Sequence, residues 1–184
     1  VLYINNSWEW SGGYGMYLEW AGEGKAPIPA EDGWDTYSDY VSQFVINEKA
    51  KGFFYDHVKH VVSRTNTVTG KPYRDDPAIF SWQISNEPRA FSSKEQDNKE
   101  AFAEWITASA KLIRSLDPNH MISTGSEGYY GCEWAMDLCE KIHAIDEISY
   151  INCHVWPYNW KWMRGDAMRE DLQKSCENTE EYIN

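Results

Sequence analysis

Hydrophobic residues along this chain follow two patterns: short continuous runs, and longer stretches in which they recur every three to four residues. A short run bounded by turn residues predicts a buried strand, and the longer period predicts an amphipathic helix. The short runs predict strands at residues 1–5, 78–85, 120–124 and 148–153. The periodic stretches predict helices at residues 48–65, 95–116, 133–143 and 166–182.

The segment between the first strand and the first of these helices, residues 6–47, is dense in tryptophan, tyrosine and glycine. Connections this long in a compact domain are usually functional or disordered, and the aromatic residues argue against disorder. Hydrophobic residues at helical spacing between Tyr37 and Val45 predict a helix in its later part. We therefore expect an ordered, functional loop that ends in a helix.

Strands alternate with helices four times, an order that is typical of an α/β fold with a parallel sheet. No linker or low-complexity tract divides the chain, so we expect a single domain over residues 1–184. A doubly wound sheet and a (β/α)₈ TIM barrel both fit this order, but no G-x-G-x-x-G motif follows a strand to support a dinucleotide-binding fold. A complete barrel needs roughly 250 residues, so four strand–helix units make about half of one.

Composition restricts the partners, because the chain has a net charge of −12 and contains ten tryptophans and twelve tyrosines. An acidic surface repels nucleic acids and anionic membranes, so we exclude both as partners. Without an apolar run of about 18 residues, we expect no membrane span. Aromatic rings combine flat apolar faces with polar edges, which suits sugar binding, although many such rings also serve a core.

Cysteine and histidine spacing gives no metal or redox motif. The four cysteines match neither a zinc ribbon nor a CxxC pattern, and they are Cys132, Cys139, Cys153 and Cys176. Cys132 and Cys139 can bridge only if the segment between them bends, since seven residues of continuous helix span roughly 10 Å. We expect four reduced, buried thiols. His57 and His60 lie one helical turn apart, but without a third ligand nearby we expect a solvated face and no metal.

Polar residues follow each predicted strand, namely Asn5-Asn6, Asn86-Glu87, Ser126-Glu127 and His154. In a barrel the carboxyl ends of all strands form one rim that carries the active site, so we expect these residues to converge. Glu87 follows eight mostly apolar residues, and desolvation raises the pKa of a carboxyl group toward that of a useful proton donor. Asn86 suits a sugar hydroxyl, and Arg89 can pair with Glu87 or reach a substrate. In isolation, Asn-Glu-Pro is also an ordinary strand-ending turn.

A longer pattern surrounds this turn, in which Asp75-Asp76-Pro77-Ala78-Ile79 precedes Trp82-Gln83 and Asn86-Glu87-Pro88-Arg89. This pattern resembles the fourth strand of glycoside hydrolase family 5. Four further segments resemble the β-mannanase branch of that family, and they are Asn6-Ser7-Trp8-Glu9-Trp10-Ser11-Gly12-Gly13, Ser115-Leu116-Asp117-Pro118-Asn119-His120, Ser123-Thr124-Gly125-Ser126-Glu127-Gly128 and His154-Val155-Trp156-Pro157-Tyr158-Asn159-Trp160. The resemblance covers essentially the whole chain and implies strands three to six of a TIM barrel with their helices.

The resemblance implies a role for each residue at the strand ends. Glu87 is implied as the catalytic acid/base, which protonates the leaving glycosidic oxygen and then activates water. Asn86 is implied to hold the 2-hydroxyl of the sugar at the cleavage point, and Arg89 to touch the leaving-group side. His154 is implied at the floor of the site near the catalytic pair, and Glu127 as a supporting residue that binds substrate.

Two departures from the family pattern affect these roles. The family's nucleophilic glutamate lies on the seventh strand, beyond the part of the barrel that this chain resembles, which leaves Glu127 as a minor alternative nucleophile. The family usually has tyrosine two residues after the sixth-strand histidine, whereas this chain has Trp156. We expect Trp156, Trp8 and Trp10 to contact sugar as stacking platforms.

The resemblance implies an endo-acting enzyme that cleaves β-1,4-mannosidic bonds in mannan, glucomannan or galactomannan by a retaining mechanism without a cofactor. It also implies a protein that is secreted, periplasmic or held at the cell surface. An endo-β-1,4-glucanase and a non-catalytic carbohydrate-binding barrel stay open as alternatives. Half a barrel has two open sheet edges, so we expect this chain alone to be inactive and to self-associate.

Overall fold

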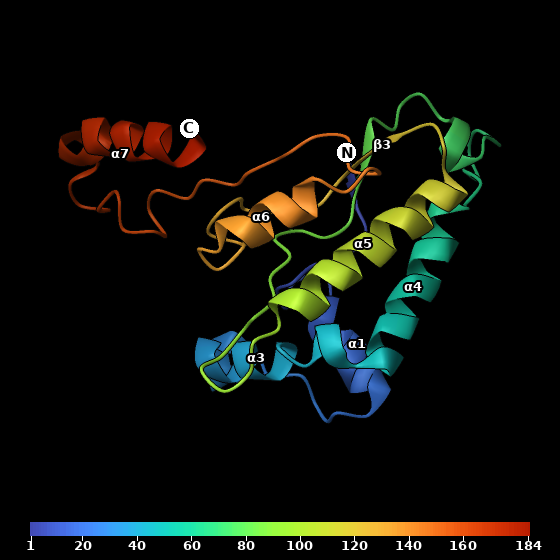
Figure 1. Cartoon of the computed structure of the whole chain (residues 1–184), viewed down its shortest axis with the longest axis horizontal. Helices are drawn as coiled ribbons and strands as arrows, with labels where there is room; N and C mark the ends of the chain where they lie inside the picture. The colour runs from blue at the N-terminus through green and yellow to red at the C-terminus, as the bar shows by residue number, and fades with distance from the viewer. The chain divides into compact units, whose positions relative to one another are not determined.

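The computed structural model describes all 184 residues, which form two compact units, Val1–Asn152 and Cys153–Asn184. The first unit contains a three-stranded parallel sheet and most of the helices (Figure 1). The second unit contains one long helix, α7 (Met168–Ile183). The prediction of a single domain stays a prediction, and we describe each unit by itself.

The sheet consists of β1 (Leu2–Tyr3), β2 (Ser81–Gln83) and β3 (Met121–Ser123), in the order β1-β2-β3 and all parallel. Trp82 pairs with Leu2 on one side and with Ile122 on the other. Backbone hydrogen bonds continue beyond these short strands, because Ile84 N donates to Ser123 O (3.0 Å). Three predicted strands are thereby confirmed, and so is the parallel α/β arrangement.

Two helices, α4 (Glu48–Val62) and α5 (Lys99–Leu116), run side by side along the sheet (Figure 1). The side chain of Asn47 caps α4 by accepting a hydrogen bond from Ala50 N (2.9 Å), which satisfies a free donor of the first turn. Hydrophobic residues every three to four positions turn one face of each helix to the core. The large residues of that core are Phe54, Val58, Phe102, Trp105, Ile106 and Ile113. Both helices confirm the sequence prediction.

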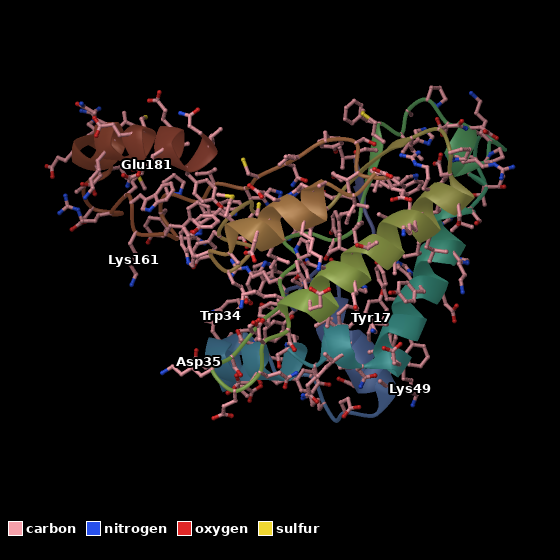
Figure 2. The ribbon with its side chains drawn as sticks, viewed as in Figure 1. Tyr17, Trp34, Asp35, Lys49, Lys161 and Glu181 are labelled. Atoms are coloured by element: carbon pink, nitrogen blue, oxygen red, sulfur yellow. The ribbon has the colours of Figure 1, made fainter.

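The segment 6–47 is more regular than the sequence indicates. It contains α1 (Gly13–Ala21), α2 (Pro29–Asp32) and α3 (Trp34–Val41), followed by a 3₁₀ turn at Phe44–Ile46. Only the last two lie in the region predicted to be helical. Tyr17 of α1, labelled in Figure 2, packs edge-on against another ring. That ring is Phe54 of α4, and the ring centroids lie 6.0 Å apart.

The start of α1 depends on a close backbone contact with Asn6, which explains why the hydrophobic pattern did not predict this helix. Gly13 has a left-handed φ of 51°, and a Cβ at this position would collide with the carbonyl oxygen of Asn6. The neighbouring amide of Tyr14 donates to that same oxygen (3.1 Å). A glycine-rich stretch that is typical of a loop therefore begins a helix here, because the chain must pass close to the end of β1.

The predicted strand at 148–153 is wrong, because the structure has no strand there. Ser149 N donates to Ile122 O (2.8 Å), as in a parallel ladder, but Ile122 N donates to the hydroxyl of Ser149 (3.1 Å). The side chain of Asn152 likewise takes the place of the backbone, since its Oδ1 accepts from Gly125 N (3.1 Å). Side-chain hydrogen bonds along the free edge of β3 replace the backbone ladder that the apolar run predicted.

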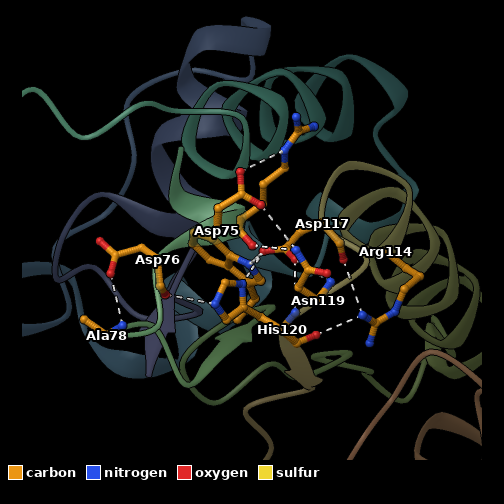
Figure 3. A network of polar contacts seen from close by, with 9 residues as sticks. Asp75, Asp76, Ala78, Arg114, Asp117, Asn119 and His120 are labelled. Carbon is orange, nitrogen blue, oxygen red and sulfur yellow. Dashed lines mark hydrogen bonds and ion pairs between the residues drawn. The ribbon is translucent and has the colours of Figure 1, made fainter. Parts of the chain in front are cut away.

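A polar network, which we call the base network, joins the amino-terminal ends of β2 and β3 (Figure 3). It is centred on Asp117, whose carboxylate accepts hydrogen bonds from Trp82 Nε1 (2.7 Å), Asn119 N (2.8 Å) and His120 N (3.0 Å) and also contacts His120 Nδ1 (2.7 Å). The other imidazole nitrogen, His120 Nε2, lies 3.0 Å from Asp76 O, and Arg114 Nη1 donates to His120 O (2.9 Å). The network ties the end of α5 to both strands.

The remaining helices complete the two units. In the first unit, α6 (Met136–His143) follows β3, and a 3₁₀ turn (Tyr73–Asp75) precedes β2. In the second unit, Trp162 contacts Tyr182 of α7 with ring centroids 5.9 Å apart, and Ser175 donates to Trp162 O (2.9 Å). Arg164 pairs with Asp171 of α7 (2.8 Å). None of the helices combines the length and the hydrophobicity that crossing a lipid bilayer requires.

Candidate active site

Two asparagines bring the carboxyl ends of β1 and β2 together. Asn6 and Asn86 face each other as a parallel bridge beyond the strands, and Asn86 Nδ2 donates to Asn6 Oδ1 (3.2 Å). The same oxygen accepts from the backbone amide of Trp8 (3.1 Å), while Asn6 Nδ2 donates to Trp10 O (3.0 Å). The Asn6 amide therefore fixes the first turn of the aromatic loop against the end of β2.

Glu87 follows directly, and it is 8% exposed. Trp8 Nε1 donates to its carboxylate oxygen Oε2 at 2.6 Å, and an indole nitrogen can only donate, so this contact orients the carboxyl group. The backbone of Glu87 has a φ of 49°, a left-handed conformation that is uncommon for a residue with a side chain. Such outliers cost free energy and cluster at functional sites.

A glycine just beyond β3 lies against the turn that carries Glu87. Glu87 N donates to Gly125 O (2.9 Å), which links the ends of β2 and β3. Gly125 itself has a φ of 85°, and a Cβ there would collide with the carbonyl oxygen of Ser85. Only glycine fits this close backbone approach, which places Glu127, two residues further on, beside the turn that carries Glu87.

Arg89 pairs with Glu127, which follows the neighbouring strand β3. Its Nε and Nη2 atoms lie 2.6 and 2.5 Å from Glu127 Oε2, and the Glu127 residue is only 1% exposed. The guanidinium also lies over the rings of Trp8 and Tyr130, with Cζ 4.9 Å from each centroid. A buried charge pair flanked by two aromatic faces holds Arg89 in one position.

The aromatic loop packs around this pair. Trp8 is half-buried and contacts Trp34 edge-on at 5.7 Å, whereas Trp10 is 57% exposed and lies 6.5 Å from Trp8. Figure 2 shows Trp34 at the start of α3. Tyr37 anchors the loop by donating to Ser7 O (2.7 Å), and burial raises the pKa of Tyr37, so its phenol stays protonated and able to donate.

Two hollows flank these residues. An open one of about 590 Å³ borders the Arg89–Glu127 pair, and its lining includes Ser92, Lys99, Tyr130, Glu133 and Trp134. A more enclosed one of about 310 Å³ lies along β1 on the far side of Asn5 and Asn6, lined also by Trp20, Phe53 and His57. Neither includes Glu87 in its lining, and the first adjoins the site through Arg89.

The structure gathers most of the predicted site residues into one group, which we call the rim cluster: Asn6, Trp8, Asn86, Glu87, Arg89, Glu127 and Tyr130. Trp10 borders it. His154 and Trp156 belong to the second unit, so their place beside Glu87 stays a prediction. Tyr130 was missed by sequence reasoning, although two adjacent tyrosines directly after the Glu127 turn were a usable signal.

Relatives of the chain match most of its length. A family model described as "GH family 5 beta-mannosidase-like" matches residues 1–184. The chain belongs to glycoside hydrolase family 5. It is 36% identical over 174 residues to mannan endo-1,4-beta-mannosidase 1 of Arabidopsis thaliana, covering 87% of this chain and 38% of that protein. It is 34% identical over 169 residues to mannan endo-1,4-beta-mannosidase 4 of Solanum lycopersicum, covering 87% and 39%.

Solved structures of family 5 members resemble the chain as well. A Rhizomucor miehei family 5 mannosidase crystallised with mannosyl-fructose superimposes with a TM-score of 0.81 at 30% identity, over 100% of this chain and 42% of that one. An endo-1,4-beta-D-mannanase of Thermotoga petrophila gives 0.67 at 26% identity, over 86% and 44%. These relatives are (β/α)₈ barrels, which confirms the predicted fold, and the chain spans about two fifths of their length.

Proposed function

We propose that this chain provides the acid/base half of a retaining endo-β-1,4-mannanase, with Glu87 as the proton-transferring residue. The observation that supports this most is the setting of Glu87, a nearly buried carboxyl group at the end of β2 that Trp8 orients through a 2.6 Å hydrogen bond. The carboxyl ends of barrel strands are where enzymes of this fold place their chemistry. Family membership and the names of the curated relatives support mannan as the substrate class.

In the first step, Glu87 donates its proton to the glycosidic oxygen while a second carboxylate attacks the anomeric carbon. In the second step, Glu87 takes a proton from water, which then attacks the glycosyl-enzyme and releases a product of retained configuration. The amide of Asn86, next to Glu87 and held by Asn6, suits a hydrogen bond to the 2-hydroxyl of the sugar at the cleavage point.

Arg89 and Glu127 serve the leaving-group side in this proposal. Because Glu127 Oε2 is occupied by two nitrogens of Arg89, Glu127 is an anchor for Arg89 and a poor nucleophile. The open hollow next to Arg89 gives room for sugar units beyond the cleaved bond. We propose that the nucleophile lies in another part of the barrel, since the chain spans about two fifths of its relatives.

The test is the Glu87→Gln variant in the full-length protein that carries this chain, assayed on mannan. Removal of a general acid costs about 10²–10⁴-fold in rate, so we expect kcat to fall by at least a hundredfold while mannan binding persists. Glu104→Gln is the matched control, because Glu104 is an exposed glutamate on α5, and it should leave kcat unchanged. Unchanged hydrolysis by Glu87→Gln contradicts the assignment.

The same assay separates the alternatives. A non-catalytic sugar-binding barrel, suggested by Trp156 in place of the family's tyrosine, predicts mannan binding without hydrolysis by the wild-type protein. Faster hydrolysis of β-1,4-glucan than of mannan indicates the glucanase alternative. We expect the 184-residue chain alone to hydrolyse neither. Secretion stays a prediction, to be tested by locating the full-length protein in the cells that produce it.

A further inference from the structure

Two cysteines lie at the ends of the turn that connects the rim cluster to α6. Cys132 is fully buried, and Cys139 lies in the first turn of α6, half-buried against the same core. The chain reverses between them, because Glu133 and Trp134 have left-handed φ angles of 56° and 60°. Ala135 N donates to Cys132 O (3.0 Å) and Ala135 O accepts from Cys139 N (3.1 Å), so one residue bridges the two cysteines.

The bend brings the side chains of Cys132 and Cys139 close enough for the two thiols to interact. His143, one turn further along α6, has Nδ1 3.6 Å from Cys139 Sγ and 2.8 Å from Cys139 O. Since a carbonyl oxygen can only accept, Nδ1 carries a hydrogen that it can also direct at the sulfur. Thr124 Oγ1 lies 3.1 Å from the other nitrogen and fixes the ring.

The two thiols are chemically unequal. The hydrogen bond from Cys132, and next the one from His143, lower the pKa of Cys139 below that of an ordinary thiol. The same hydrogen bond, and then burial, raise the pKa of Cys132. Cys139 is half-exposed and ionises readily, whereas Cys132 is buried and does not. This is the arrangement of an attacking and a resolving cysteine.

We propose that Cys132 and Cys139 are a redox-active dithiol that low-molecular-weight disulfides, such as oxidised glutathione, convert to an intramolecular disulfide. The Cys139 thiolate attacks one sulfur of the small disulfide, forming a mixed disulfide and releasing one small thiol. Cys132 then loses its proton and attacks Cys139 Sγ, forming the protein disulfide and releasing the second small thiol. Two protein thiols are oxidised and one small disulfide is reduced to two thiols.

The bridge would close a short loop that contains Glu133 and Trp134 and follows Tyr130, the ring that packs on Arg89. Cross-linking a loop restricts the unfolded chain, so the oxidised form should melt a few degrees higher than the reduced form. This inference uses the geometry of the first unit alone and does not rest on the proposed function.

The test treats the reduced full-length protein with oxidised glutathione, alkylates free thiols and maps the tryptic peptide of residues 115–141, which contains both cysteines and no others. We expect this peptide to lose two hydrogens, about 2 Da, and to resist alkylation without carrying glutathione. Cys132→Ser should trap a stable glutathione adduct on Cys139, whereas Cys139→Ser should leave Cys132 unmodified because it is buried. His143→Gln should slow modification of Cys139, most clearly at pH 6.

Only Cys132 of the four cysteines is buried, so the prediction of four buried thiols is wrong. The exposed Cys153 and Cys176 are the internal controls for access of the reagent. The proposal is overturned if they react while the 115–141 peptide stays reduced, or if the wild-type peptide retains glutathione. It is also overturned if Cys139→Ser is modified at Cys132 as fast as the wild type. Circular dichroism of each variant shows whether it is folded, and mannan hydrolysis plays no part in the readout.

Discussion

The two ends of the parallel sheet carry polar residues of the same kinds, yet they use them differently. In the base network, the Asp117 carboxylate is surrounded by donors from Trp82, Asn119 and His120. In the rim cluster, Glu87 holds a left-handed backbone, and the nearby side-chain amide of Asn5 is buried without a hydrogen-bond partner in the chain. The buried carboxylate of the base network is fully hydrogen-bonded. The carboxyl end of the sheet instead contains an unpaired buried amide and a left-handed backbone.

This difference indicates which end the protein keeps for stability and which for chemistry. A buried polar group without a partner costs about 1–3 kcal/mol, and a left-handed non-glycine residue costs a similar amount. Residues that break local rules are expected where function requires them. In barrels, the amino-terminal ends of the strands serve stability and the carboxyl ends carry the active site.

The largest stability effect should follow Asp117→Asn, which breaks the base network. In the variant, an NH₂ group replaces the carboxylate oxygen that faces Trp82 Nε1 and His120 Nδ1, so donors would face donors. We expect the free energy of unfolding at neutral pH, measured with urea, to fall by about 3 kcal/mol. Asp146→Asn is the control, because Asp146 is an exposed aspartate after α6. It should change the free energy of unfolding by less than about 0.5 kcal/mol. Once folded, the Asp117→Asn protein should keep its kcat on mannan.

The pH dependence sharpens this prediction. Burial raises the pKa of Asp117, but the hydrogen bonds from Trp82, His120 and Asn119 together outweigh it, so the net pKa is lowered. A lowered folded pKa gives stability that is present above the unfolded pKa and is lost as the pH falls through the folded pKa. The stability gap between wild type and Asp117→Asn should therefore narrow in acid. A gap that is constant with pH argues against a charged Asp117.

A smaller effect should follow Trp8→Phe in the rim cluster. The variant keeps most of the ring but removes the hydrogen bond to Glu87 Oε2, so we expect about a tenfold lower kcat on mannan with little change in KM. Loss of a donor to the carboxylate should also move the alkaline limb of the pH–rate profile upward. Trp20→Phe, at an exposed ring of α1 outside the rim cluster, is the control. Equal kcat losses in both variants would show that Trp8 does not position Glu87.

Much of the fold was predictable because its signals are local. The periodic stretches of α4 and α5 and the apolar runs of β2 and β3 carry their structure in their own spacing. The apolar run at 148–153 wrongly predicted a strand, because the side chains of Ser149 and Asn152 accept hydrogen bonds that a strand backbone would accept at this edge of the sheet. The helix α1 was missed because its start depends on the close backbone approach of Gly13 to Asn6, which the spacing of hydrophobic residues does not encode.

The sequence was sufficient to select the residues of the site, but not to predict which of them contact each other. Placement at strand ends was enough to select Asn86, Glu87 and Glu127 as neighbours. The pair between Arg89 and Glu127 could not be predicted, because the two residues lie 38 positions apart in the sequence. The hydrogen bond from Trp8 to Glu87 spans 79 residues, and only the folded backbone determines which end of the indole faces the carboxylate.

The most direct test of Glu87 as acid/base uses Glu87→Ala in the full-length protein, with a dinitrophenyl β-mannobioside and added azide. This leaving group departs without a proton, so the glycosyl-enzyme should form and then accumulate for lack of a base to activate water. We predict that azide, which needs no base, accelerates turnover at least about tenfold and yields the β-mannobiosyl azide. No acceleration, or an α-mannobiosyl azide, would contradict the assignment of Glu87.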